Sequence, residues 1–253
     1  MKRNLVMLCA VLLLWALPAA AANTPSANTF SNWAAIVVAG DWHSHSGAPS
    51  EVFDNARRDV SAGFERIGVS PDNLIQFSVR PDRYPEAHPL QADADTVANS
   101  LWDLSNRASG GCLIYFSSHG SPDGIVLGGS ILTPPMLEAM LHNSCAGRPT
   151  VVILSACFSG AFVPALAGPN RLILTAARWD RTSFGCGDND KYPFFDDCVL
   201  KSLPRSTDFP QLAQDVDDCV ARREQAVHVD RPSDPQLSVG VRVLAALPHW
   251  RVQ

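Results

Sequence analysis

A cysteine and a histidine occupy matching places at the ends of two apolar segments. Residues 150–160 read TVVILSACFSG, an apolar run followed by small residues and Cys157. Residues 112–120 read CLIYFSSHG, a similar run that ends in His119 and a glycine. A thiol becomes an effective nucleophile when a neighbouring imidazole takes its proton. The pair therefore indicates nucleophilic catalysis, provided that the fold brings the two segments side by side.

Small residues around this pair leave space for a peptide backbone. Gly120 follows His119, and Ala156 and Ser159 flank Cys157. The backbone N–H groups of Gly120 and Cys157 could then hold the oxyanion that forms when a thiolate attacks a carbonyl group. The non-catalytic alternative is that Cys157 is a small buried hydrophobe and that His119 is an ordinary turn residue.

The pattern along the chain predicts an α/β fold in which strands and helices alternate. Apolar runs bounded by turn residues are typical of strands buried on both faces of a parallel sheet. A strand–helix–strand order gives a right-handed crossover, so the carboxyl ends of such strands meet at one edge. The predicted strands are 33–40, 73–79, the runs before His119 and Cys157, 171–176 and 237–244. The predicted helices are 51–67, 92–107, a short one from 133, 192–203 and 208–226.

Two polar segments of the chain are expected to be loops near the chemistry. Residues 41–49 contain His43 and His45, an H-x-H pair. Such a pair can bind a metal, but without a third ligand it favours a loop at the mouth of the site. Residues 177–191 are polar and rich in Gly and Asp, as an active-site loop would be. No metal and no cofactor are predicted.

The first 22 residues have the pattern of a secretory signal peptide. Lys2 and Arg3 precede an apolar run over 5–17, and alanines fill 19–22. The run is shorter than the roughly 20 apolar residues that a membrane span needs. The prediction is a signal peptide at 1–22, a single domain at 23–253, and a periplasmic or secreted protein without a membrane span. The net charge of −5 and the lack of a basic patch argue against nucleic-acid binding.

The cysteines are expected to include disulfides, because the exported chain would meet an oxidising compartment. If Cys157 stays free, an odd number remains after the signal peptide, so one other thiol is unpaired. Cys112, inside an apolar strand, is the predicted unpaired thiol. Cys186, Cys198 and Cys219 could supply a bridge. No C-x-x-C occurs, which argues against a thiol–disulfide oxidoreductase.

Three blocks of the sequence resemble a known family of enzymes. SSHGSPDG around His119 and SACFSG around Cys157 are similar to the two catalytic blocks of the legumain-like cysteine peptidases, peptidase family C13 of the caspase-like clan. Residues 174–186, LTAARWDRTSFGC, are similar to the segment that follows the catalytic cysteine in that family. The resemblance extends over about residues 33–243 and is greatest to the bacterial branch.

The resemblance implies a fold and a role for each matching residue. The fold would be a caspase-like three-layer α/β/α sandwich with a mostly parallel central sheet. Cys157 would be the nucleophile, His119 the general base and acid, and the backbone of Gly120 and Cys157 the oxyanion hole. Thr182 and Ser183 would line the cleft and bind the peptide or protein substrate.

The chain departs from legumain at the pocket that selects asparagine. Legumain uses an arginine after the first strand, a glutamate two residues before the nucleophile and an aspartate further on. Asn55 falls near the arginine's place, Ser155 holds the glutamate's place, and Asp197 matches the aspartate. Ser155 and Asp197 are therefore predicted substrate-binding residues, but a preference for asparagine does not follow from them.

The resulting prediction is an exported cysteine endopeptidase that hydrolyses peptide bonds through a Cys157/His119 dyad and an acyl-enzyme thioester. One alternative is a peptide ligase or transamidase that uses the same site. Another is a catalytically inactive exported binding protein, although retention of both dyad residues argues against it. The sequence does not determine the oligomeric state.

Overall fold

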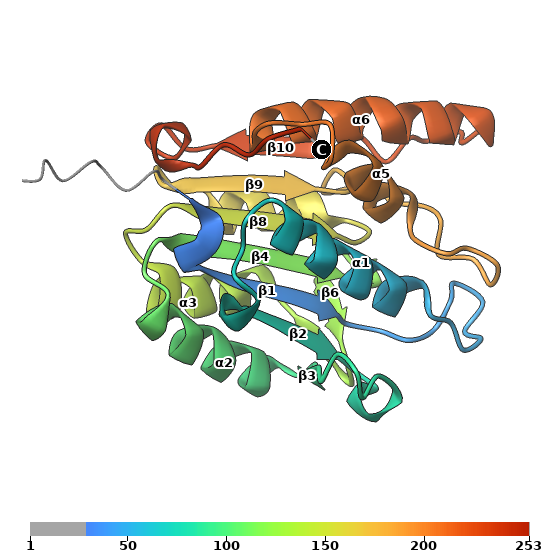
Figure 1. Ribbon diagram of the computed structural model, residues 1–253. Coiled ribbons are helices and arrows are strands. Elements are labelled where there is room, and N and C mark those ends of the chain that lie inside the picture. Colours follow the sequence, from blue (N-terminus) through green and yellow to red (C-terminus); the bar gives the residue numbers. More distant parts are fainter. Residues whose placement is uncertain (1–28, 253) are drawn as a thin grey trace, which may run out of the picture.

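The computed structural model describes residues 29–252 and is built on a seven-stranded sheet (Figure 1). The predicted signal peptide, residues 1–22, lies outside the described residues. The strand order is β10-β9-β8-β4-β1-β2-β3, and only β10 runs antiparallel to its neighbour. The strands are β1 Trp33–Ala39, β2 Leu74–Ser78, β3 Leu90–Gln91, β4 Gly111–Ser117, β8 Thr150–Ser155, β9 Arg171–Thr175 and β10 Gln236–Val239.

Helices cover both faces of this sheet, as Figure 1 shows. One layer holds α1 Val52–Arg66, α5 Phe194–Ser202 and α6 Phe209–Ala226. The other holds α2 Ala94–Arg107, α3 Pro134–Cys145 and α4 Val163–Leu166. Short 3₁₀ helices span Phe30–Asn32, Pro71–Asn73, Pro81–Arg83, Ser159–Phe162 and Leu244–Ala246. The predicted three-layer α/β/α sandwich with a mostly parallel sheet is therefore confirmed.

Each central strand contributes to two hydrophobic cores, one under each helical layer. Every residue of β1, β4 and β8 is buried. In β4, Leu113 and Tyr115 join the core under α1, α5 and α6, whereas Ile114 and Phe116 join the opposite core. Successive side chains of a strand point to opposite faces, so a strand between two helical layers must be apolar throughout. This explains the continuous apolar runs in the sequence.

A small second sheet follows His119, where no strand was predicted from the sequence. It comprises β5 Gly120–Ser121, β6 Gly124–Leu127 and β7 Ser130–Leu132, paired antiparallel. Ile125, Leu127 and Leu132 are buried in the core beneath α2 and α3. These apolar side chains hold the sheet in place, although each strand is too short for alternation to reveal it.

The cysteine pairing differs from the prediction at one position. Cys112 forms a disulfide with Cys145 at the end of α3, so the prediction that Cys112 is the unpaired thiol is wrong. Cys112 is buried in β4, but its side chain points to the helical layer in which α3 ends at Cys145, so the two sulfur atoms can bond. Cys198 and Cys219, two of the three cysteines that could supply a bridge, form a second disulfide between α5 and α6, and Cys157 and Cys186 are free.

The disulfide between α5 and α6 should stabilise the fold mainly by restricting the unfolded chain. It joins cysteines separated by 21 residues, and closing a loop of that length is worth about 3 kcal/mol. The double variant Cys198→Ala/Cys219→Ala should lose about that much unfolding free energy in urea titrations. An unchanged unfolding midpoint would contradict this expectation.

Within residues 29–252, no helix is both long and apolar enough to cross a membrane. Over the same residues, no cluster of three or more His, Cys, Asp or Glu side chains could hold a metal ion.

Candidate active site

The two catalytic candidates lie at the same edge of the sheet. β4 and β8 are adjacent and parallel, and Ser117 pairs with Ser155 at their carboxyl ends. His119 and Cys157 each follow two residues later. Open α/β sheets place their ligand sites outside the carboxyl ends of the strands. The predicted juxtaposition of the two strands is therefore present.

His119 and Cys157 line one cavity of about 500 Å³. Its walls are formed by His45, His119, Gly120, Cys157, Phe158, Thr182, Ser183, Phe184, Gly185, Cys186 and Gly187. Among the described residues, this lining includes no Asp, Glu, Lys or Arg. The cavity therefore offers a thiol, imidazoles, hydroxyls and aromatic surface, without a fixed charge to select a charged ligand.

A backbone carbonyl group fixes the imidazole of His119. Its Nε2 lies 3.1 Å from the carbonyl oxygen of His43. Because a carbonyl oxygen can only accept, Nε2 carries the proton, and Nδ1 of the neutral ring keeps a lone pair. Phe53 packs edge-on against the ring, with the ring centroids 4.9 Å apart. These contacts fix the tautomer of the neutral ring and leave Nδ1 with the lone pair that a base requires.

The carbonyl group of His43 belongs to the loop at residues 41–49, which Asp41 organises. The Asp41 carboxylate accepts hydrogen bonds from the backbone N–H groups of Trp42 and His43, at 2.6 and 3.0 Å. It also lies 2.8 Å from Nδ1 of His43. The loop is at the mouth of the site, as predicted, because His45 lines the cavity. Sequence reasoning missed the role of the His43 carbonyl, which no side-chain motif reveals.

The two predicted site loops are joined across one end of the cavity. The N–H of His45 donates to the carbonyl oxygen of Cys186 at 2.7 Å. The Asp188 carboxylate accepts hydrogen bonds from the hydroxyls of Ser44 and Ser46. These contacts link the loop that contains His45 to the loop that contains Cys186, and both residues line the cavity.

The turn that carries Cys157 has a constrained backbone. Phe158 has a left-handed conformation, with φ at 58°, which is uncommon for a residue with a bulky side chain. Its N–H donates to the carbonyl oxygen of Arg181 at 2.8 Å. The N–H of Ser183 lies 3.2 Å from Sγ of Cys157 and donates to it. Negative charge on that sulfur would be stabilised by this backbone dipole.

Gly120 is packed against the backbone of Cys157. A Cβ atom at position 120 would lie 2.0 Å from the carbonyl oxygen of Cys157 and 3.0 Å from its nitrogen. Only glycine fits such an approach. The two backbones proposed for an oxyanion hole are therefore adjacent.

The predicted substrate-binding residues divide into two groups. Thr182 and Ser183 line the cavity. Ser155 does not, because it is buried and its hydroxyl donates to Asp196 at 2.6 Å. Asp197 is also elsewhere, since its carboxylate pairs with Arg223 and Lys201 on the outer side of α5.

The residue before Asp197 in the chain faces a different way. A shift of one residue along a helix turns the side chain by about 100°. Asp196 thus points towards the sheet, whereas Asp197 points towards α6. The half-buried Asn55 lies outside the cavity and donates to the carbonyl oxygen of Lys191.

Asp196 is a fully buried carboxylate that the sequence analysis did not single out. It accepts hydrogen bonds from Tyr115, Ser117 and Ser155, at 2.5, 3.0 and 2.6 Å. Burial raises the pKa of Asp196 to about 6, although the three hydroxyl donors act in the opposite direction. The signal available in the sequence was a pair of aspartates directly after two phenylalanines, near the start of the predicted helix at 192–203.

This raised pKa makes a contribution to stability that depends on pH. The folded protein holds the Asp196 proton more tightly than the unfolded chain, whose carboxyl has a pKa near 3.8. The contribution is therefore complete below pH 3.8 and is lost as the pH rises through 6. Asp196→Asn removes it. The unfolding free energy of this variant, relative to wild type, should rise by about 2 to 3 kcal/mol from pH 4 to pH 8.

Urea titrations of both proteins at the two pH values measure this change. A difference between variant and wild type that is the same at both pH values would show that Asp196 does not titrate in this range.

The second free thiol of the described chain, Cys186, also lines the cavity. It packs against Ala39, Val52 and Phe53. Burial, together with the nearby charge of Cys157, raises the pKa of Cys186 to about 11. Since only the thiolate reacts, Cys186 should be a poor nucleophile at neutral pH.

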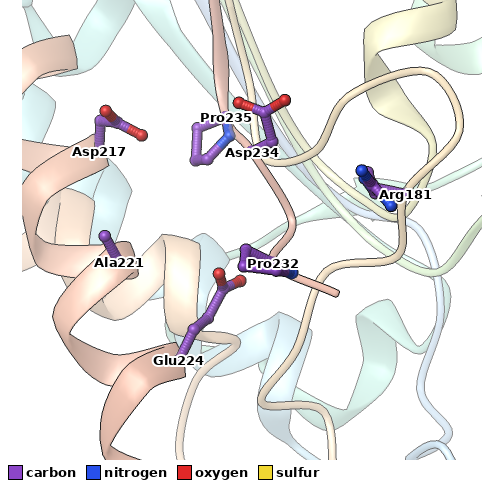
Figure 2. A pocket seen from close by; sticks show the side chains of 7 residues that line it. All are labelled: Arg181, Asp217, Ala221, Glu224, Pro232, Asp234 and Pro235. Atoms are coloured by element: carbon purple, nitrogen blue, oxygen red, sulfur yellow. The ribbon is translucent and has the colours of Figure 1, made fainter. Parts of the chain in front are cut away.

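A second cavity, of about 330 Å³, opens between α6 and the chain near its carboxyl end (Figure 2). Asp217 and Glu224 come from α6, and Pro232, Asp234 and Arg181 lie across the cavity from that helix. Burial and the charges of Asp218 and Asp234 raise the pKa of Asp217. This cavity lacks a thiol and an imidazole, so it is not the candidate catalytic site.

Comparisons with known proteins agree with this arrangement. No curated protein matches the chain. Among solved structures, caspase-1 from Spodoptera frugiperda is similar, with a TM-score of 0.60 and 14% sequence identity. The match covers 85% of this chain and 88% of that one, and it shows the caspase-like fold. The model of the peptidase C13 family matches residues 78–230, which is more than half of the chain. The protein therefore belongs to the peptidase C13 family, whose members are cysteine peptidases of the legumain type.

Proposed function

We propose that the protein is an exported cysteine endopeptidase that hydrolyses peptide bonds with Cys157 and His119. One observation carries the proposal: the thiol and an imidazole with a fixed tautomer line the same cavity. The family and the fold support the reaction class.

The reaction would begin with a proton transfer. Nδ1 of His119 takes the proton of the Cys157 thiol, and the thiolate attacks the carbonyl carbon of the scissile bond. The C–S bond forms, and the electron pair of the C=O bond moves to oxygen. The N–H groups of Gly120 and Cys157 are the proposed donors to that oxyanion.

The intermediate then collapses to products in two stages. The C–N bond breaks, and the leaving amine takes the proton from His119. A thioester remains on Cys157. Water, deprotonated by His119, attacks the thioester, and the products are a carboxylic acid and the restored thiol.

The lining of the cavity supports a preference for uncharged side chains next to the cut. Thr182 and Ser183 are proposed to hold the substrate backbone, while Phe158, Phe184 and Cys186 provide apolar surface. A charged side chain would lose hydration there without finding an opposite charge. The place of legumain's glutamate is taken by Ser155, which is buried and bonded to Asp196.

Export is supported by the pattern of residues 1–22 and by two disulfides in the described chain. Disulfides are rare in reducing cytosols and common in exported proteins. Amino-terminal sequencing of the exported protein tests this part, with Asn23 as the expected first residue. Recovery of the uncleaved chain in the cytoplasm would contradict it.

A single quench experiment tests the reaction and separates the alternatives. The enzyme is mixed with a diverse peptide library and with glycinamide, then denatured in acid. Mass spectrometry should find acyl groups on Cys157 and carboxylic acids as the main products. Predominant glycinamide adducts would instead favour a ligase or transamidase. Absence of acyl groups and of any product, with peptides still retained by the native protein in gel filtration, would indicate an inactive binding protein.

A further inference from the structure

The buried carboxylate of Asp196 connects the two strands that carry the catalytic candidates. Its Oδ2 accepts a hydrogen bond from Ser117 of β4 at 3.0 Å and another from Ser155 of β8 at 2.6 Å. Its Oδ1 accepts from Tyr115 of β4 at 2.5 Å. All three partners and Asp196 itself are buried, with exposed fractions of 2% or less. No solvent competes for these bonds.

The positions of the two serines relate this connection to the chemistry. Ser117 and Ser155 are directly opposite each other in the parallel register. Each precedes a catalytic candidate by two residues, Ser117 before His119 and Ser155 before Cys157. One carboxylate oxygen therefore clamps the last residue of each catalytic strand.

A carboxylate is suited to this role because it only accepts hydrogen bonds. Two facing serine hydroxyls could rotate among several arrangements, but a shared carboxylate oxygen requires both to donate to it. Such charge-assisted hydrogen bonds are shorter and stronger than neutral ones. The backbone adds one more link, from the N–H of Ser118 to the carbonyl oxygen of Ser155 at 3.0 Å.

The cost of burying Asp196 indicates that it has a function. A buried charge is costly even when it is hydrogen-bonded, and an apolar residue of similar size is often at least as stable. The raised pKa of Asp196 reflects this cost. Removing it would leave the hydroxyls of Ser117 and Ser155 free to pair with each other at lower cost.

We propose that Asp196 is a positioning residue that fixes the distance between His119 and Cys157 by clamping the ends of β4 and β8. The proposal rests on the function proposed above. Asp196 touches neither substrate nor the reacting atoms, because it does not line the cavity. Without the clamp, the imidazole and the thiol sample poorer geometries, so proton transfer slows. Substrate binding by Thr182 and Ser183 is unaffected.

Asp196→Asn tests the proposal because asparagine has the size of aspartate but has no charged oxygen that could accept hydrogen bonds from both serines. The kcat for a cleaved peptide should fall about 10- to 100-fold, with KM unchanged within about threefold, as expected when a catalytic group is misplaced rather than binding lost. Alkylation of Cys157 by iodoacetamide should slow in parallel, whereas alkylation of Cys186 should not change.

Two serine variants and a matched control keep the proposal testable if Asp196→Asn folds poorly. Ser117→Ala and Ser155→Ala each remove one hydroxyl, and each should lower kcat. Their double variant should match Asp196→Asn, because the two serines act through one group. Asp103→Asn changes an exposed aspartate on α2 and should leave kcat and alkylation at wild-type values.

The outcomes separate the two proposals. A folded Asp196→Asn protein with wild-type kcat and wild-type alkylation of Cys157 overturns the positioning role, and so does a rise in KM with unchanged kcat. If wild-type Cys157 reacts no faster than Cys186 and no peptide is cleaved, the proposed function itself fails.

Discussion

Replacing His119 by alanine should slow peptide hydrolysis by about 10²- to 10⁴-fold, the range that a well-placed general base contributes. The variant removes the imidazole that is proposed to accept the proton of the Cys157 thiol, and His45 is the one histidine left among the described residues that line the cavity. The variant also leaves the carbonyl group of His43 without the donor that it has in the wild type. Alkylation of Cys157 by iodoacetamide should slow as well, since the thiolate is the reacting species.

Cys186 is an internal reference for the alkylation rate of Cys157. Cys186 lines the same cavity, but its pKa of about 11 keeps it protonated at neutral pH. Site-resolved mass spectrometry should show Cys157 reacting much faster than Cys186 in the wild type. His142→Ala, which removes an exposed histidine on α3, is the matched control and should behave as wild type. Equal alkylation rates at Cys157 with and without His119 would show that the imidazole does not activate the thiol.

The second large effect is expected from adding a single methyl group at Gly120. In Gly120→Ala, the new Cβ would lie 2.0 Å from the carbonyl oxygen of Cys157, so the two backbones must move apart. Loss of one oxyanion donor alone typically costs about 10²- to 10³-fold in kcat. Peptide turnover should fall by at least that factor, as measured by initial rates at saturating substrate.

Gly129→Ala is the control for Gly120→Ala, because a Cβ atom at position 129 meets nothing within 4 Å. It lies in the turn between β6 and β7, away from the cavity lining. Its turnover should equal that of the wild type. A Gly120→Ala protein with normal turnover would show that this close backbone approach has no part in catalysis.

Strong local signals made the central part of the fold predictable from the sequence. The runs before His119 and Cys157 are apolar over their central residues, 112–116 and 151–154, because helices cover both faces of β4 and β8. A strand–helix–strand order with a right-handed crossover then brings the two strand ends to one edge of the sheet. Buried parallel strands and the right-handed crossover together predicted that His119 and Cys157 lie close to each other at that edge.

Long-range contacts between side chains could not be predicted in the same way. The pairing of Cys112 with Cys145 depends on where α3 ends above β4, which no periodicity specifies. The partner of His119 is a backbone carbonyl group, which has no sequence signature. Asp196 and Asp197 are neighbours in the sequence, and only the direction that the helix gives each side chain separates the buried carboxylate from the one that pairs with Arg223.

Cleavage of a diverse peptide library by the purified protein, with Cys157→Ala in parallel, tests whether the protein hydrolyses peptides through the Cys157 thiol. We expect cleavage by the wild type, no cleavage by the variant, and uncharged residues before most of the cut bonds. Cleavage that persists in Cys157→Ala would show that the reaction does not depend on this thiol, and would contradict the proposed function.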